Sequence, residues 1–200
     1  PAQLVRDARE HGVEVRPVDV SYSGWNNSLE GSDRTPALRI GLRQIEGFRE
    51  DWAEALAAAR AFSLSNIETL ARRAALSSAA MRKLADADAF RSLGLDRREA
   101  LWAVRRLPDH APLPLFAAAD ARELGAEPDA RLPTMALGEH VAADYQTLRL
   151  SLKAHPMAIL RPIFDAEGLL TCAQTEARRG GALVQVAGVV LVRQRPGKGN

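Results

Sequence analysis

The stretch RIGLRQIEGFREDWAEALAAA, residues 39–59, constrains the fold of this chain more than any other. A basic, aliphatic segment tightens into a corner at residues 45–48 and then opens a helix with Trp52 and Leu56 on one face. Gly47 permits the positive φ that such a corner requires. A corner of this kind serves equally well for packing or for binding a phosphate, and the rest of the chain must decide between them.

Short helices joined by tight corners are predicted throughout residues 41–106. The capping-box patterns SNIE at residues 65–68 and DRRE at residues 96–99 each mark a helix start. We therefore expect a mainly α fold with a small β element. The other predicted elements are a helix over 2–11, strands over 13–20 and 37–42, a loop over 21–35, a helix over 78–85 and a long strand over 182–200.

Composition bounds the class of protein. The 200 residues carry a net charge of only +2 and contain 46% hydrophobic residues, which is typical of a globular chain. The single Cys172 excludes an internal disulfide framework, fits a reducing cytoplasm and is expected to be a small buried side chain. No apolar run reaches the roughly 18 residues of a membrane span. Since the chain opens on Pro1 without Met, we expect a piece of a longer protein.

Charge is distributed unevenly along the chain. Residues 72–106 contain nine basic and four acidic side chains, whereas residues 120–144 are mostly acidic and every charge after Glu176 is positive. This segregation indicates basic surfaces separated by an acidic spacer. A solvated helix face would carry a similar pattern, so both interpretations stay open.

The corner at Gly47 is predicted to belong to a helix–hairpin–helix. In that motif the free N–H groups and positive dipole end of the second helix meet a DNA phosphate, without reading sequence. Arg49 stands where a second glycine is usual and offers a guanidinium instead. A second corner, LADADAF at residues 84–90, has Asp88 where glycine would be expected, and we predict a structural role for it. The residues expected to contact DNA are Gly47, Phe48, Arg49, Arg72, Arg73, Arg82, Lys83, Arg97 and Arg98.

Catalytic patterns are weak. Asp86 and Asp88 have the D-x-D spacing with which nucleotidyl transferases hold Mg²⁺, and a small metal-dependent enzyme is one alternative. On a helix end, however, the two carboxylates would diverge. The histidines lack ligand spacing, and no P-loop or nucleophile elbow is present. We therefore expect no catalytic residue, no metal ligand and no cofactor within this chain.

The proline- and alanine-rich residues 107–136 are predicted to form a linker. Its PLPLF segment carries Leu113, Leu115 and Phe116, which can dock into a hydrophobic pocket of a partner. Packing of the same side chains back onto the helices is the alternative.

Five segments, in order, resemble the bacterial C-family DNA polymerases of the alpha-subunit type. The motifs within 84–108 and 113–125 are most similar to the error-prone branch of that family. The five matching segments are PAQLVRDAREHGVEVRPVDVSYS (1–23), LRIGLRQIEGF (38–48), MRKLADADAFRSLG (81–94), LRLSLKAHPM (148–157) and VQVAGVVLVRQRPGKGN (184–200).

The resemblance implies a domain order. Residues 1–40 would end the fingers region, 41–106 would form a tandem helix–hairpin–helix domain, 107–136 the linker, 137–181 a helical connector, and 182–200 the first strand of an oligonucleotide-binding (OB) fold. The catalytic aspartates and Mg²⁺ of the parent polymerase would lie elsewhere.

The resemblance also implies a function: DNA synthesis across damage in the cytoplasm. The implied partners are duplex DNA, an inactive Y-family-like protein and a RecA-like protein. The sliding clamp would be bound only indirectly, because Pro112 replaces the Gln of the clamp peptide. A scaffold for these partner proteins, with little DNA binding of its own, is the alternative.

Overall fold

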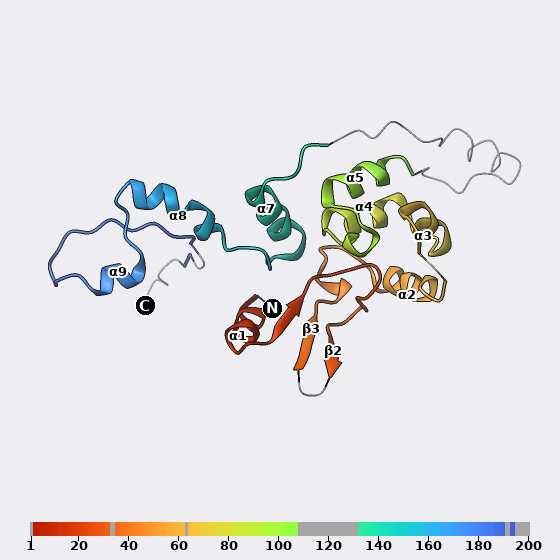
Figure 1. The fold of residues 1–200 in the computed structure, drawn as a ribbon, viewed down its shortest axis with the longest axis horizontal. Helices are drawn as coiled ribbons and strands as arrows, with labels where there is room; N and C mark the ends of the chain where they lie inside the picture. Colours follow the sequence, from red (N-terminus) through yellow and green to blue (C-terminus); the bar gives the residue numbers. More distant parts are fainter. Residues whose placement is uncertain (1, 33–34, 63, 108–131, 191–192, 195–200) are drawn as a thin grey trace, which may run out of the picture. The chain divides into compact units, whose positions relative to one another are not determined.

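The computed structural model describes residues 2–32, 35–62, 64–107, 132–190 and 193–194. The chain divides into two compact units, Pro1–Lys153 and Ala154–Asn200. The fold is mainly helical with one small sheet, as predicted (Figure 1). The predicted partner-binding residues Leu113, Leu115 and Phe116 lie outside the described residues.

The first unit opens with a helix and a three-stranded sheet in the order β1-β3-β2. β1 pairs with β3 in parallel, with Val15 opposite Leu38, and β2 pairs with β3 antiparallel. Val5 of the first helix is buried in the same core as Val18 and Val20, which follow β1. The elements are α1 (Ala2–Glu10), β1 (Glu14–Arg16), β2 (Ser28–Ser32) and β3 (Thr35–Arg39).

The strand β2 corrects the prediction of a loop over residues 21–35. Its turn-forming residues are held in strand geometry by the antiparallel ladder to β3. Ion pairs add to this, because Glu30 accepts from Arg39 at 2.9 and 3.0 Å and from Arg16 at 3.0 Å. Pairing with a neighbour overrides the low strand propensity of Ser, Gly and Glu.

Helices α2 to α5 follow the sheet in the chain and lie beside it in Figure 1. Asp96 and Glu99 make the predicted capping box at the start of α5. The predicted cap at residues 65–68 is shifted by one residue, because Asn66 rather than Ser65 accepts the first-turn N–H, from Thr69 at 2.8 Å. The elements are η1 (Leu42–Gln44), α2 (Glu50–Ala59), α3 (Ile67–Arg73), α4 (Ser78–Asp86), η2 (Arg91–Leu93) and α5 (Arg97–Arg105).

One hydrophobic core joins the sheet side, these helices and α7 (Leu137–Leu148). Each buried leucine or phenylalanine contributes about 1.5–3 kcal/mol relative to exposure to water. The core includes residues from all three regions, so α7 and the loop after it are part of the same unit as α5, although 31 residues of sequence separate the two helices. Its most buried large side chains are Leu42, Leu56, Leu70, Met81, Leu84, Phe90, Val18 and Val20, and Leu148 and Leu150 extend it.

Gly41 fixes the approach of the 24–27 loop to the first corner. A Cβ at this position would lie 2.4 Å from the carbonyl carbon of Asn26 and 2.4 Å from the carbonyl oxygen of Trp25. The loop is bonded on both sides of the glycine, by Gly41 N–H to Asn27 Oδ1 at 2.8 Å and by Leu42 N–H to Gly24 O at 2.8 Å. The backbone at Gly41 therefore packs directly against the backbone of Trp25 and Asn26, and no side chain fits between them.

Gly41→Ala should destabilise the chain by about 1–3 kcal/mol in urea unfolding, because the loop must move away to admit the methyl group. Gly138→Ala is the matched control, since it lies in α7 with open space around its Cβ position. It should be neutral or stabilise by up to about 1 kcal/mol. Equal stabilities of the two variants would contradict the close approach.

The second unit contains α8 (Pro156–Ala166) and α9 (Cys172–Glu176). Helices α7, α8 and α9 lie within residues 137–181, and the division between the two units falls inside that segment. Cys172 is exposed at the start of α9, which corrects the expectation that it is buried.

The predicted long strand over residues 182–200 is not formed in its described part, residues 182–190 and 193–194. There a single parallel bridge joins Leu170 to Val186. Val186, Val189 and Val190 are exposed. A strand needs neighbours that take up its backbone hydrogen bonds along its whole length, and Leu170 is a bridge partner at one residue only.

The lengths and compositions of the described helices bear on membrane insertion. None of these helices combines the length and the apolar character that crossing a membrane requires.

Candidate nucleic-acid interface

The first corner has the geometry that its sequence predicts. Gly47 is exposed at the tip with φ +67°, between the buried side chains of Ile45 and Phe48. Phe48 N–H donates to Ile45 O at 3.1 Å and closes the turn. η1 leads into the corner and α2 leaves it. The two buried side chains thus hold the turn to the core while the glycine faces solvent.

The start of α2 is open to an anion but carries acids of its own. The N-cap residue Arg49 makes no side-chain capping bond, so the first-turn N–H groups are left for another acceptor. Glu50 and Asp51 lie in that turn. Arg49 pairs with Asp51 at 2.9 and 2.7 Å and lies over the Trp52 ring, 5.3 Å from its centroid. One of the two acidic charges is therefore offset.

Lys83 of α4 brings a cation to the corner. Its Nζ donates to Glu46 O at 2.8 Å, and a Cβ on Gly47 would lie 2.9 Å from that Nζ. The glycine therefore has a second role beyond its positive φ, because it lets the ammonium group reach the turn. An ammonium group has three protons, so the bond to Glu46 leaves others for a phosphate.

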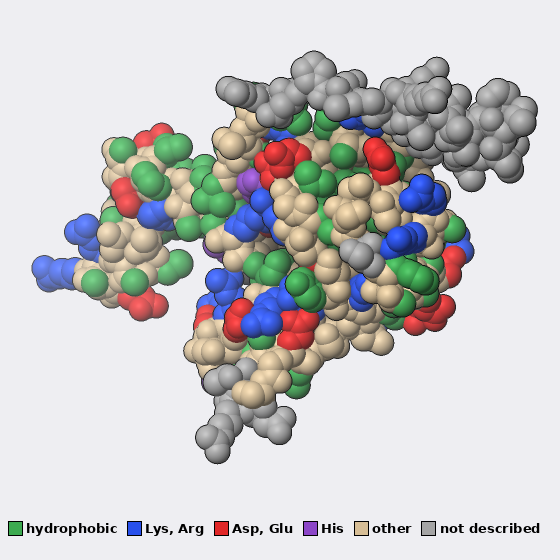
Figure 2. All heavy atoms as spheres, turned by 45° about the vertical axis from the view of Figure 1, so that its right-hand side comes forward, with side chains coloured by type: hydrophobic (Ala, Val, Ile, Leu, Met, Phe, Trp, Pro, Cys, Tyr) green, Lys and Arg blue, Asp and Glu red, His purple; other side chains and the backbone are tan. Residues whose placement is uncertain are grey.

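The other predicted DNA contacts are scattered. Arg72 and Arg73 end α3, where Arg73 lies over the Phe62 ring at 5.2 Å, and Arg82 is exposed on α4. Arg98 donates to Pro133 O at 2.6 Å and pairs with Glu139 at 3.3 Å. Figure 2 shows one face of the molecule, on which the Lys and Arg side chains form separate groups, several of them with Asp or Glu beside them. This face has no continuous basic belt.

Two predicted contacts do not fit the structure. Phe48 is 6% exposed and its N–H is used within the turn, so its role is packing. Arg97 is 1% exposed. A side chain enclosed by the core cannot reach a phosphate. The sequence contained a signal for Arg97, because it shares the buried face of α5 with Ala100 and Val104 at helical spacing.

Arg97 instead pairs with Asp144 of α7 in a buried ion pair. It also donates to His140 O at 2.9 Å, while Asp144 accepts from Ser151 Oγ at 2.7 Å and pairs with Lys153 at 3.3 Å. Burial, together with the charge of Arg97, lowers the pKa of His140. Sequence reasoning missed Asp144, although it lies between Val141 and Leu148 on the buried face of α7.

The second corner is structural, as expected. Asp88 adopts φ +61°, and Ala89 N–H donates to Leu84 O at 3.0 Å across the turn. The Asp88 carboxylate is 7% exposed and bonds Arg91 at 2.8 and 3.0 Å and Lys153 at 3.0 Å. Burial opposes ionisation, but these cations outweigh it and hold the pKa of Asp88 below its usual value.

The D-x-D pair does not fit a metal site. The Asp88 carboxylate is already bound by two cations, and burial raises the pKa of Asp86. Within the described part of the chain, no group of three or more His, Cys, Asp or Glu side chains could hold a metal ion. These residues therefore do not match the Mg²⁺ ligands that a polymerase would require.

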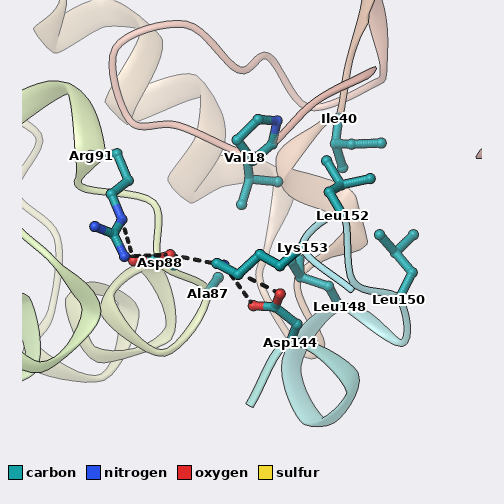
Figure 3. A pocket seen from close by; sticks show the side chains of 11 residues that line it. Val18, Ile40, Ala87, Asp88, Arg91, Asp144, Leu148, Leu150, Leu152 and Lys153 are labelled. Atoms are coloured by element: carbon teal, nitrogen blue, oxygen red, sulfur yellow. Dashed lines mark hydrogen bonds and ion pairs between the residues drawn. The ribbon is translucent and has the colours of Figure 1, made fainter. Parts of the chain in front are cut away.

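A cavity of about 220 Å³ lies between the sheet side, the second corner and the segment after α7 (Figure 3). Val18 and Ile40 line it opposite Leu148, Leu150 and Leu152. Figure 3 shows its charged wall, in which Lys153 bridges Asp88 and Asp144. Because these charges are paired with one another, the cavity offers mainly aliphatic contacts.

Comparison with known proteins agrees with this geometry. A family model described as a helix-hairpin-helix motif matches residues 12–100. The chain is 54% identical, over its full length, to 19% of an error-prone DNA polymerase of Rhodopseudomonas palustris. It is 56% identical over 98% of its length to 18% of a Brucella abortus protein with the same name, and 45% identical to 22% of one from Bradyrhizobium diazoefficiens.

By sequence, the chain is similar along nearly its whole length to proteins named error-prone DNA polymerase. It spans about a fifth of the length of the curated relatives it matches. The resemblance to the error-prone branch is confirmed. The helix–hairpin–helix is confirmed as a motif, and the first corner lies inside the matched residues.

Removing one partner of the buried pair tests its role in stability. Asp144→Ala should lower the free energy of unfolding by about 3–5 kcal/mol, because Arg97 would stay buried without its counter-ion. The double variant Arg97→Met, Asp144→Leu removes both charges and should lose less than the single variant. Lys153 keeps Asp88 as a partner in both. Urea unfolding of the wild type and the two variants gives the comparison, and a double variant less stable than Asp144→Ala would contradict the pairing.

Proposed function

We propose that this chain is the duplex-holding portion of an error-prone DNA polymerase. It binds the phosphate backbone through its first corner without reading base sequence. The supporting observation is the combination at that corner of an exposed Gly47 tip, uncapped first-turn N–H groups of α2, and the Lys83 ammonium group. These are the donors that a phosphate accepts at a helix N-terminus.

The hold on DNA is weak in this proposal. Glu50 and Asp51 place carboxylates in the first turn of α2, where a phosphate would approach. Arg49 offsets Asp51, and Glu50 stays exposed to solvent. A second corner of the tandem type would add nothing, because its Asp88 is enclosed by cations. We infer a steadying role behind an active site that lies elsewhere in the polymerase.

The parent protein would synthesise DNA across damage in the cytoplasm, with its catalytic aspartates and Mg²⁺ outside this chain. The proposed partners are an inactive Y-family-like protein and a RecA-like protein, with the sliding clamp reached indirectly. Residues 182–200 would begin an OB fold whose other strands complete the ladder. The 54–56% identity to proteins named error-prone DNA polymerase supports this assignment.

Fluorescence anisotropy with a labelled 20-mer duplex at two salt concentrations tests the proposal. Lys83→Gln should weaken binding and reduce the salt slope by about 0.9, the contribution of one phosphate contact. Arg49→Gln should also weaken binding. The matched control is Arg6→Gln, which removes the same charge from an exposed site on α1. Equal losses for Lys83→Gln and Arg6→Gln would contradict a site at the corner.

The scaffold alternative is favoured by the burial of Phe48 and Arg97 and by the scattered basic groups. Absence of duplex binding at low salt would support it over the proposal. Capture of the Y-family-like protein, lost on Leu115→Ala with Phe116→Ala, would then identify the linker as the binding segment.

A further inference from the structure

Glu46, the residue before Gly47, is held by a segment about a hundred residues later in the chain. Glu46 N–H donates to Thr147 O at 2.8 Å, and Gln44 Nε2 donates to Leu148 O at 2.9 Å. Both acceptors lie in the last turn of α7, whose carbonyl groups have no partner within the helix. The first corner therefore caps α7, and α7 in turn holds the corner.

Arg149 adds a third contact from the same place. Its Nε donates to Glu46 Oε2 at 2.9 Å, and its backbone has φ +59°. Leu148 and Leu150, its two neighbours in the chain, are 6% and 4% exposed. Because both neighbours are anchored in the core, the backbone at Arg149 is held in place and its side chain is directed toward Glu46. The hydrogen bond from Arg149 lowers the pKa of Glu46. With Lys83 on the Glu46 carbonyl, residue Glu46 is held through its N–H, its C=O and its side chain.

We propose that the end of α7 positions the first corner for DNA, with Arg149 as the positioning side chain. This inference rests on the proposed function, because it concerns the same phosphate site. By holding Glu46 back against α7, these contacts direct Gly47 and the first turn of α2 outward. They also pair the Glu46 carboxylate, which would otherwise repel a phosphate.

The position of α7 itself depends on the pair between Asp144 and Arg97. Asp144 lies one turn before Leu148, so the buried charge and the capped end belong to one short helix. A change at Asp144 should therefore be felt at Glu46, although the hydrogen bonds and ion pairs of the Asp144 carboxylate go to Arg97, Ser151 and Lys153. The direction of the change in DNA affinity distinguishes this coupling from a general effect of net charge. Asp144→Asn makes the chain more positive by one unit, so a charge effect alone would tighten DNA binding.

Amide hydrogen exchange and duplex anisotropy on the same chains test the inference. Asp144→Asn should speed exchange of the Glu46 amide at least tenfold more than it speeds exchange of the Leu56 and Leu84 amides, which report global unfolding, and should weaken duplex binding. Gln146→Ala, on the exposed face of α7, is the control and should change neither. Unchanged Glu46 exchange, or faster exchange with equal or tighter duplex binding, would overturn the inference.

Arg149→Gln keeps the test decisive if Asp144→Asn does not fold, because Arg149 is 69% exposed. It should speed Glu46 exchange and weaken duplex binding more than Arg6→Gln, which removes the same charge. Arg149→Lys should restore part of both effects. An equal loss of binding in Arg149→Gln and Arg6→Gln, with Glu46 exchange unchanged, would refute positioning.

The exchange measurement also separates this inference from the proposed function. Failure of the wild-type chain to bind duplex at low salt would remove the DNA role for both. Faster Glu46 exchange in Arg149→Gln would still show that α7 holds the corner. Unchanged exchange would show that it does not.

Discussion

The buried ion pair between Arg97 and Asp144 is the interaction on which the rest of the first unit depends. It joins α5, before the linker, to α7, after it, and both side chains are almost fully removed from solvent. A buried pair contributes little net stability compared with apolar side chains of the same size, but leaving one partner alone is strongly unfavourable. The pair therefore specifies where α7 packs, and the position of α7 determines how Glu46 is held.

The electrostatics of the first corner are a balance of opposed charges. Lys83 bonds the Glu46 carbonyl and Arg149 its carboxylate, and Arg49 offsets Asp51 at the start of α2. Such exposed pairs are individually weak. Their effect is on the field that an approaching phosphate meets, since acids near a helix N-terminus occupy the position that favours an anion. This is the physical basis for expecting a weak hold on DNA.

Local chemistry in the sequence predicted most of the helical fold. The positive φ of Gly47, the capping box of Asp96 and Glu99, the helix after the Gly47 corner and the bounds of α4 all follow from turn residues, caps and helical spacing. The structural role of the Asp88 corner also followed, because an acid there is unfavourable beside a phosphate. Each of these features depends on a few residues that are neighbours in the chain, so the sequence alone is enough to predict it.

Features that depend on distant contacts were predicted poorly. The strand β2 forms because β3 is beside it, and the segment at 182–190 is not a strand because it has one bridging partner among the described residues. The charge of Arg97 predicts a place on the surface, but its helical spacing from Ala100 and Val104 predicts the buried face of α5, and the spacing is right. Nothing local in residues 144–149 indicates that their partners are Arg97 and Glu46.

The most direct test of the account is residue-by-residue chemical-shift mapping of the ¹⁵N-labelled chain during titration with a duplex. The account predicts the largest amide shifts at residues 46–52, with smaller shifts at 147–150 transmitted through the Glu46 contacts. Shifts confined to the 84–90 corner or to Ala154–Asn200, with residues 46–52 unchanged, would contradict it.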